Sequence, residues 1–237
     1  MVDRADVTSQ GEVAPSLRAQ LLATEHWSLL ASRSTTQNEV LVRIAIYLTL
    51  VSASVVSLAL IGQATDFDGR FNAFTIVLFS ILLLVGTLTL FRVLNGGEED
   101  LAYVIGMNRI RAGYAELDSG IERYFVTSTH DDQRGITQTY TYFSQSSPFI
   151  QPLASSGMFI LVVAAMVAGT LAGLVANAAG GSGAVIAIAS AIVGASYFAV
   201  CMSHFARRYM RWQREYGALF PHAAAPVAGA VPSATSD

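Results

Sequence analysis

The sequence predicts an all-α polytopic membrane protein, with four transmembrane helices in two hairpins and with amphipathic cytoplasmic helices. Composition is the first reason: of 237 residues, 53% are hydrophobic and only 13% are charged, whereas roughly a quarter of an ordinary soluble domain is charged. The second reason is four separate apolar runs of membrane length, and the third is a one-sided distribution of arginines around them. These observations disfavour a soluble protein with wholly buried helices.

Four apolar runs define the predicted spans. At about 1.5 Å per residue, each run is long enough to cross a hydrocarbon core of roughly 30 Å. A short polar loop follows the first run and another follows the third, so we expect a hairpin over 40–91 and a second over 154–203. The spans cover residues 40–61, 71–91, 154–178 and 184–203.

The arginines predict the orientation. All 14 basic residues are arginines, and only Arg70 falls in a loop inside a hairpin. The others precede the first span, lie in the central segment 92–153 or follow the fourth span. Positively charged flanks stay on the cytoplasmic side. We therefore expect both termini and the central segment in the cytoplasm.

Hydroxyl side chains in the first hairpin have two interpretations. Thr49, Ser54 and Ser57 of the first span could line a pore. They could equally bond to backbone carbonyls or across a helix pair, which is the interpretation we favour.

Small residues recur every four positions in the second hairpin. Gly169 and Gly173 belong to one such stripe in the third span, and Ala191 and Ala195 to another in the fourth. Small residues at this spacing let two helices approach closely in lipid. We expect a tight contact between these two spans, with contact to another subunit as the alternative.

The stretch LFRVLNGGEEDLAY predicts a helix boundary. Asn95 followed by Glu98 fits a capping box, and residues 95–97 should break the helix before a new one begins at Glu98. The new helix should carry an apolar seam that needs a cover. The N-terminal helix of the same chain, a neighbouring subunit and a cytoplasmic protein partner are the candidate covers. The seam consists of Tyr103, Met107, Ile110, Tyr114 and Leu117.

The N-terminal segment 1–39 should contain a helix that begins at Pro15. Thr36 and Glu39 form a second candidate capping box before the first span. The sequence leaves open whether residues 16–61 form one helix or two.

Residues 124–153 lack a clear helical period. Three adjacent metal-binding side chains at positions 130–132 do not converge from several directions, so we expect a solvated loop and no metal site. The run TQTYTYF alternates as a strand does, although no partner strand is visible.

A basic and aromatic helix is predicted over 204–220, as a continuation of the fourth span. Arginines and aromatic side chains suit the anionic inner leaflet, where each cation contributes on the order of 1 kcal/mol. A generic interfacial anchor is the simpler interpretation. Residues 221–237 form a Pro/Ala-rich tail that should be disordered. The predicted lipid-binding residues are Arg207, Arg208, Arg211, Arg214 and Trp212.

From Leu21 to the end of the fourth span, the chain resembles a group of small bacterial four-span membrane proteins without an assigned activity. The phrases EHWSLLASRSTTQNEVLVRIAIYLTLVSASVVSLAL and EEDLAYVIGMNRIRAGYAELDSGIERY carry this resemblance. It implies the bacterial plasma membrane and carries over no functional residue. The plan is also similar in outline to the two-span effectors of bacterial conflict systems, from which the second hairpin departs.

Catalytic motifs are missing from the sequence. It has no GxxxxGK[ST], HExxH, CxxC or GxSxG. A net charge of −3 also argues against nucleic-acid binding. We expect a non-enzymatic interaction or scaffold protein without a cofactor, acting as a homo-oligomer that binds a cytoplasmic partner. The alternative is an oligomeric ion channel lined by the first two spans.

Overall fold

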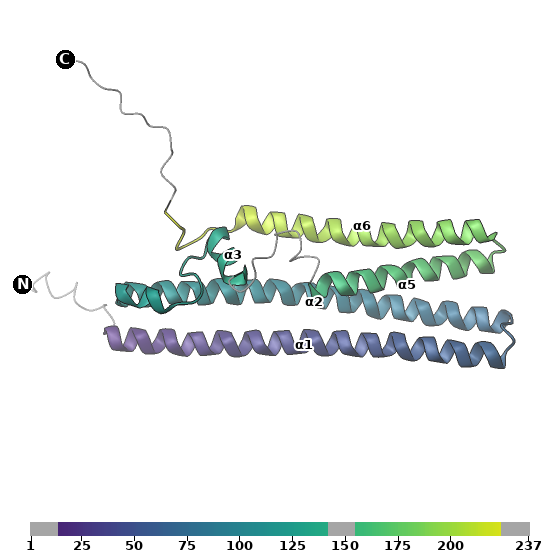
Figure 1. Cartoon of the computed structure of the whole chain (residues 1–237), viewed down its shortest axis with the longest axis horizontal. Helices are drawn as coiled ribbons and strands as arrows, with labels where there is room; N and C mark the ends of the chain where they lie inside the picture. The colour runs from purple at the N-terminus through teal and green to yellow at the C-terminus, as the bar shows by residue number, and fades with distance from the viewer. Residues whose placement is uncertain (1–13, 142–154, 224–237) are drawn as a thin grey trace, which may run out of the picture. The chain divides into compact units, whose positions relative to one another are not determined.

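The computed structural model describes residues 14–141 and 155–223, and all regular elements among them are helices. Four of the helices are long and apolar enough to cross a membrane, which confirms an all-helical chain compatible with a multi-pass membrane protein. Figure 1 shows the elements in chain order. They are α1 (Pro15–Ala64), α2 (Gly69–Leu117), the 3-10 helix η1 (Ser119–Tyr124), α3 (Gln133–Thr141), α5 (Ser156–Ala178) and α6 (Gly183–Glu215).

The chain divides into two compact units. We call Met1–His26, Val104–Ser144 and Gly217–Asp237 the head unit, and Trp27–Tyr103 with Gln145–Tyr216 the span unit. Two of the boundaries between the units, after His26 and after Tyr103, fall inside continuous helices, because α1 and α2 each contribute residues to both units.

A single helix covers the region that could have formed two. Helix α1 runs unbroken from Pro15 to Ala64, so the capping box predicted at Thr36 and Glu39 is wrong. Thr36 is buried and donates a hydrogen bond of 3.1 Å to Glu99 of α2. Glu39 binds Arg92 of α2 and Arg43 of its own helix. Both side chains therefore bind residues of α2, and Glu39 also binds a residue of its own helix. Neither caps the start of a helix.

The predicted helix break at residues 95–97 is also wrong, since α2 continues from Gly69 to Leu117. A glycine inside a helix costs only about 1 kcal/mol relative to alanine, and packing offsets such a cost. A Cβ added at Gly96 would lie 2.6 Å from Val40 Cγ2. The expected capping residues Asn95 and Glu98 both bind Arg208 of α6.

The strand-like run is helical where the structure describes it. Helix α3 covers Gln133–Thr141, and the rest of the run lies outside the described residues. The Gly135 amide donates to the Asp132 carboxylate at 2.8 Å at the start of this helix. The Thr137 and Thr139 hydroxyls bond back to the carbonyls four residues earlier. These local bonds satisfy the polar groups of a short helix without any partner strand.

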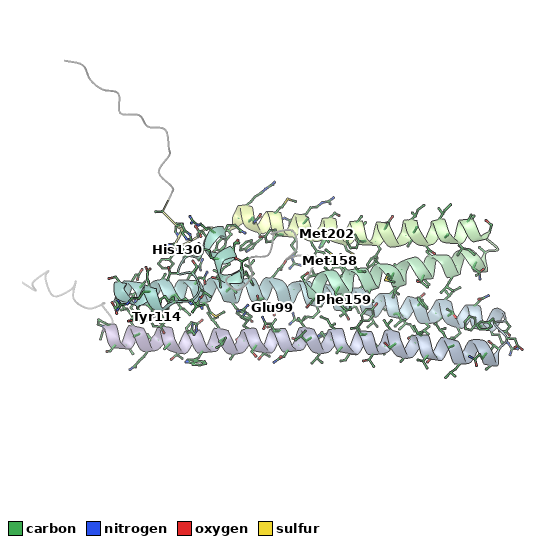
Figure 2. All side chains as sticks on the ribbon, viewed as in Figure 1. Glu99, Tyr114, His130, Met158, Phe159 and Met202 are labelled. Atoms are coloured by element: carbon green, nitrogen blue, oxygen red, sulfur yellow. The ribbon has the colours of Figure 1, made fainter. Side chains whose placement is uncertain are left out.

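The four long helices share one apolar core in the span unit. Met158 of α5 and Met202 of α6, labelled in Figure 2, pack against its buried residues. Tyr47 of α1 is fully buried, and an added Cβ at Gly86 of α2 would meet its hydroxyl oxygen at 2.4 Å. The buried residues of this core are Ile44, Tyr47, Leu90, Val93, Ile160 and Leu161.

Glycines set the distance between α5 and α6. An added Cβ at Gly169 would lie 2.7 Å from the backbone oxygen of Ser190, and one at Gly173 would lie 2.3 Å from Ser190 Oγ. On α6, a Cβ at Gly194 would lie 3.1 Å from the carbonyl oxygen of Ala165. The two backbones approach closely because side chains are absent at these positions.

Replacing these glycines should separate backbone clashes from side-chain clashes. We expect Gly169→Ala to destabilise the protein by roughly 1–3 kcal/mol, because a backbone oxygen cannot rotate away. Gly173→Ala should lower the free energy of unfolding by less, because the clashing atom is the Ser190 hydroxyl oxygen. In a protein that also carries Ser190→Ala, we expect Gly173→Ala to have no effect. The measurement is thermal unfolding in nanodiscs.

Gly97→Ala is the matched control, since no atom lies within 4 Å of the added Cβ. It should be neutral or slightly stabilising. Equal losses for Gly97→Ala and Gly169→Ala would contradict this packing account.

Candidate functional site

A buried polar centre organises the head unit. The side chain of Asn108, on α2, is fully buried. Its Nδ2 donates to the carbonyl oxygen of His130 at 2.8 Å, and its Oδ1 accepts from Arg111 at 2.9 Å and from Thr139 of α3 at 3.1 Å. One side chain therefore joins α2, the loop before α3 and α3 itself.

Asp131 is the second buried member of this centre, with no exposed surface. Its carboxylate accepts from Arg109 Nε at 2.7 Å and from the backbone amides of Leu219 at 3.0 Å and Phe220 at 2.8 Å. A buried carboxylate needs such partners to offset its desolvation. The prediction of a solvated loop is therefore wrong at Asp131, which holds the segment that follows α6.

Asp132 binds the same segment beside it. Its carboxylate accepts from the backbone amide of His222 at 2.9 Å and from His222 Nδ1 at 2.8 Å. Partial burial acts to raise the pKa of Asp132, but the amides of Gly135 and His222 and the His222 ring outweigh it and hold that pKa below its ordinary value. The His222 ring stacks on His130, with ring centroids 3.8 Å apart.

A hollow of about 320 Å³ lies next to this contact. Phe220 and Pro221 line it from the C-terminal segment, and Ala112 and Ala115 line it from α2. His130, labelled in Figure 2, also lines it. No group of three metal-binding side chains was found in the described part of the chain.

A second polar cluster lies in the span unit, where the predicted spans end. Arg92 binds Glu39 of α1 at 2.7 Å and Glu99 of its own helix at 3.1 Å; Glu99 is labelled in Figure 2. Arg33 of α1 binds Asp100 of α2 at 2.6 Å. Hydrogen bonds from Arg92, then from Arg43, lower the pKa of Glu39 to about 2. This cluster connects α1 to α2 through charge pairs.

The predicted seam is partly covered by its own chain. Met107 and Ile110 are buried, at 4% and 5% exposure, while Tyr103, Tyr114 and Leu117 are half-buried. Helix α1 packs on α2 next to the seam residue Tyr114, since a Cβ added at Gly113 of α2 would lie 3.1 Å from Leu22 Cδ1. In addition, Arg18 of α1 pairs with Glu116 of α2. A partner could reach Met107 or Ile110 only by displacing part of the head unit, and the role of the seam in partner binding stays a prediction.

The hydroxyls predicted as alternative pore-lining groups bond within their own helix. Thr49 donates to the Ala45 carbonyl at 2.8 Å, Ser54 to Leu50 at 2.7 Å and Ser57 to Ala53 at 2.8 Å. This agrees with the interpretation that we favoured from the sequence.

The two small-residue stripes differ in their surroundings. Gly169 and Gly173 are buried in the contact between α5 and α6. Ala191 and Ala195 are exposed, and all four residues line a groove of about 880 Å³ along the same two helices. The role of these two alanines in helix packing stays a prediction.

The four arginines predicted to bind lipid are not equivalent. Arg207, Arg211 and Arg214 are exposed, and no carboxylate among the described residues pairs with them. Arg208 instead pairs with Glu98 and donates to Asn95 at 3.2 Å. Trp212 stacks against Tyr209 and Tyr216, with ring centroids 6.1 and 4.9 Å away. Binding of the anionic leaflet at this helix stays a prediction.

Sequence reasoning missed the buried centre of Asn108 and Asp131. Asn108 lies off the apolar seam, and Asp131 stands in a polar run that resembles any exposed loop. The one available signal was the absence of an apolar period after residue 124, which does not identify a partner.

The pKa of Glu39 predicts how the charge cluster responds to pH. Since this pKa falls from 4.5 to about 2 on folding, the pair contributes stability above pH 4.5 and loses it as the pH falls through about 2. The melting temperature of wild type should exceed that of Glu39→Gln at pH 6, and the difference should narrow toward pH 2. Thermal unfolding in nanodiscs measures this difference.

Glu25→Gln serves as the control, because Glu25 is also exposed. It should change the melting temperature little at any of these pH values. A difference between wild type and Glu39→Gln that is constant from pH 6 to pH 2 would contradict the assigned role of the pair.

Comparisons with known protein families, curated proteins and solved structures gave no match to this chain. Its function must therefore be inferred from its own geometry.

Proposed function

We propose that this protein is a non-enzymatic interaction or scaffold protein of the bacterial plasma membrane. It assembles as a homo-oligomer and presents the head unit to a cytoplasmic protein partner. The observation that carries this proposal is the packed head unit, whose buried Asn108 and Asp131 fold distant stretches of the chain into one body. A folded unit of this kind offers a preformed surface, so little conformational entropy is lost when a partner binds.

The exposed apolar residues of α1 support partner binding. Leu17 is 48% exposed and Leu21 is 58% exposed, and four residues separate them, which places them on one helix face. We assign this face to the cytoplasmic partner. Exposure of two apolar side chains to water is unfavourable, and binding of a protein partner would bury them.

The arginine distribution supports the orientation. We propose that α1 with α2 and α5 with α6 form two membrane-crossing hairpins, with both termini and the head unit in the cytoplasm. The connections between the paired helices are short, from Thr65 to Asp68 and from Ala179 to Ser182. Arg70 is the single arginine close to either connection, as the positive-inside rule requires.

The groove along α5 and α6 supports a contact between subunits. Ala191 and Ala195 leave this surface open on α6, whose most apolar stretch is not buried by the rest of the chain. Small residues on an open helix face favour close helix association in lipid. The channel alternative has less support, because Thr49, Ser54 and Ser57 already bond to carbonyls of their own helix.

Native mass spectrometry of nanodisc-extracted complexes tests both parts of the proposal. The wild type should contain several copies of the chain and an additional polypeptide. Changing both Leu17 and Leu21 to Asp should remove the additional polypeptide and keep the copy number, because charge replaces the apolar contact. Gln20→Asp, an exposed polar position on the same helix, should retain both.

The same measurement tests the contact between subunits separately from partner binding. Ala191→Leu combined with Ala195→Leu should reduce the number of copies, since larger side chains fill the groove. Ala59→Leu, at an exposed position of α1, should leave that number unchanged. A wild-type complex that is monomeric and carries no other polypeptide would contradict the proposed function.

A further inference from the structure

We propose that Asp131 and Asp132 form a peptide-recognition site for a segment that contains the pattern Phe-Pro-His. The segment Leu219–His222 of the same chain occupies this site. Its ligand in trans is the same segment of a second copy. The inference goes beyond the proposed scaffold function and stands without it, because a synthetic peptide can probe the site directly.

The first argument is the match between backbone donors and carboxylate acceptors. The amides of Leu219 and Phe220 donate to the two oxygens of Asp131, and the amide of His222 donates to Asp132. Between them lies Pro221, which has no amide hydrogen. Each backbone amide that the segment uses as a donor therefore meets a carboxylate oxygen. No acceptor is needed at Pro221, which has no amide hydrogen.

A backbone bond in the reverse direction fixes the segment further. The amide of Asp131 donates to the carbonyl oxygen of Phe220 at 3.3 Å. Because Asp131 is fully buried and also bound to Arg109, its carboxylate is held in place. A held acceptor loses little entropy when a ligand amide binds.

Side chains supply the sequence preference. The His222 ring lies between the Asp132 carboxylate, 2.8 Å from its Nδ1, and the stacked His130 ring. Phe220 and Pro221 line the hollow of about 320 Å³ with α2 residues. Backbone bonds alone accept many sequences, whereas an aromatic residue, a proline and a histidine in this order restrict the ligand.

The segment is suited to exchange because it is short and superficial. Leu219 is 65% exposed and Pro221 is exposed, and hydrogen bonds to Asp131 and Asp132 hold the segment. Segments with few buried apolar contacts open at low free energy. In cis, however, the tether gives the segment an effective concentration of roughly millimolar, so a free ligand must compete with it.

The test weakens the cis segment and supplies the same segment in trans. Full-length protein carrying Phe220→Ala and His222→Ala, in nanodiscs, is titrated with a fluorescent peptide of residues 217–223. We expect saturable binding at least tenfold tighter than to the wild type, where the intact cis segment competes. Adding Asp132→Asn to the double variant should weaken binding at least tenfold.

A matched peptide and a folding readout complete the design. The peptide that carries both alanines should bind at least tenfold more weakly than the native peptide. Hydrogen exchange at the amide of Asn108 reports whether the head unit stays folded. If the double variant perturbs that exchange, Leu219→Pro replaces it, because it removes one donor from the cis segment and leaves the carboxylates intact.

Two results would overturn the proposal. One is no measurable binding of the native peptide to a variant whose Asn108 amide is protected as in the wild type. The other is equal binding with and without Asp132→Asn, which would place the peptide elsewhere on the protein.

Discussion

The ion pairs of Arg92 are the interaction on which the arrangement of α1 and α2 depends. The guanidinium binds Glu39 across the helix pair and Glu99 along its own helix, and its side chain is only 21% exposed. A guanidinium that engages two carboxylates fixes geometry better than a single exposed pair does. Because Glu39 and Arg92 border the apolar runs, the charge cluster marks where these helices leave the membrane in our account. Each helix then continues into the head unit without a break.

The sequence predictions for the fold succeeded where local patterns determine the structure and failed where long-range contacts do. Apolar runs and the glycine spacing are local, so four long helices and the close approach at Gly169 and Gly173 followed from the sequence. Asn95 to Glu98 resembled a helix start, since Asn-Gly-Gly favours a break and acids favour a helix N-terminus. In the structure, Val40 packs on Gly96, and Arg208 binds Asn95 and Glu98. Tertiary contacts overrode the local preference.

The candidate site was beyond prediction for a related physical reason. Asp131 binds backbone amides 88 and 89 positions away. No periodicity or motif encodes such a contact, because backbone donors are present at nearly every residue. The role of Asn108 was equally unpredictable, since the sequence does not distinguish a buried asparagine from an exposed one. The sequence does show a proline at position 221, but its missing amide donor becomes informative only beside the carboxylates of Asp131 and Asp132.

The central proposal is that the four apolar helices cross the membrane, with the head unit in the cytoplasm. Cysteine accessibility in intact cells tests it most directly, in a Cys201→Ala background that removes the native thiol. We expect a membrane-impermeant maleimide to label Asp68→Cys, between α1 and α2, in intact cells. It should label Asp118→Cys, directly after α2, only after the membrane is opened. Labelling of Asp118→Cys in intact cells would contradict the account.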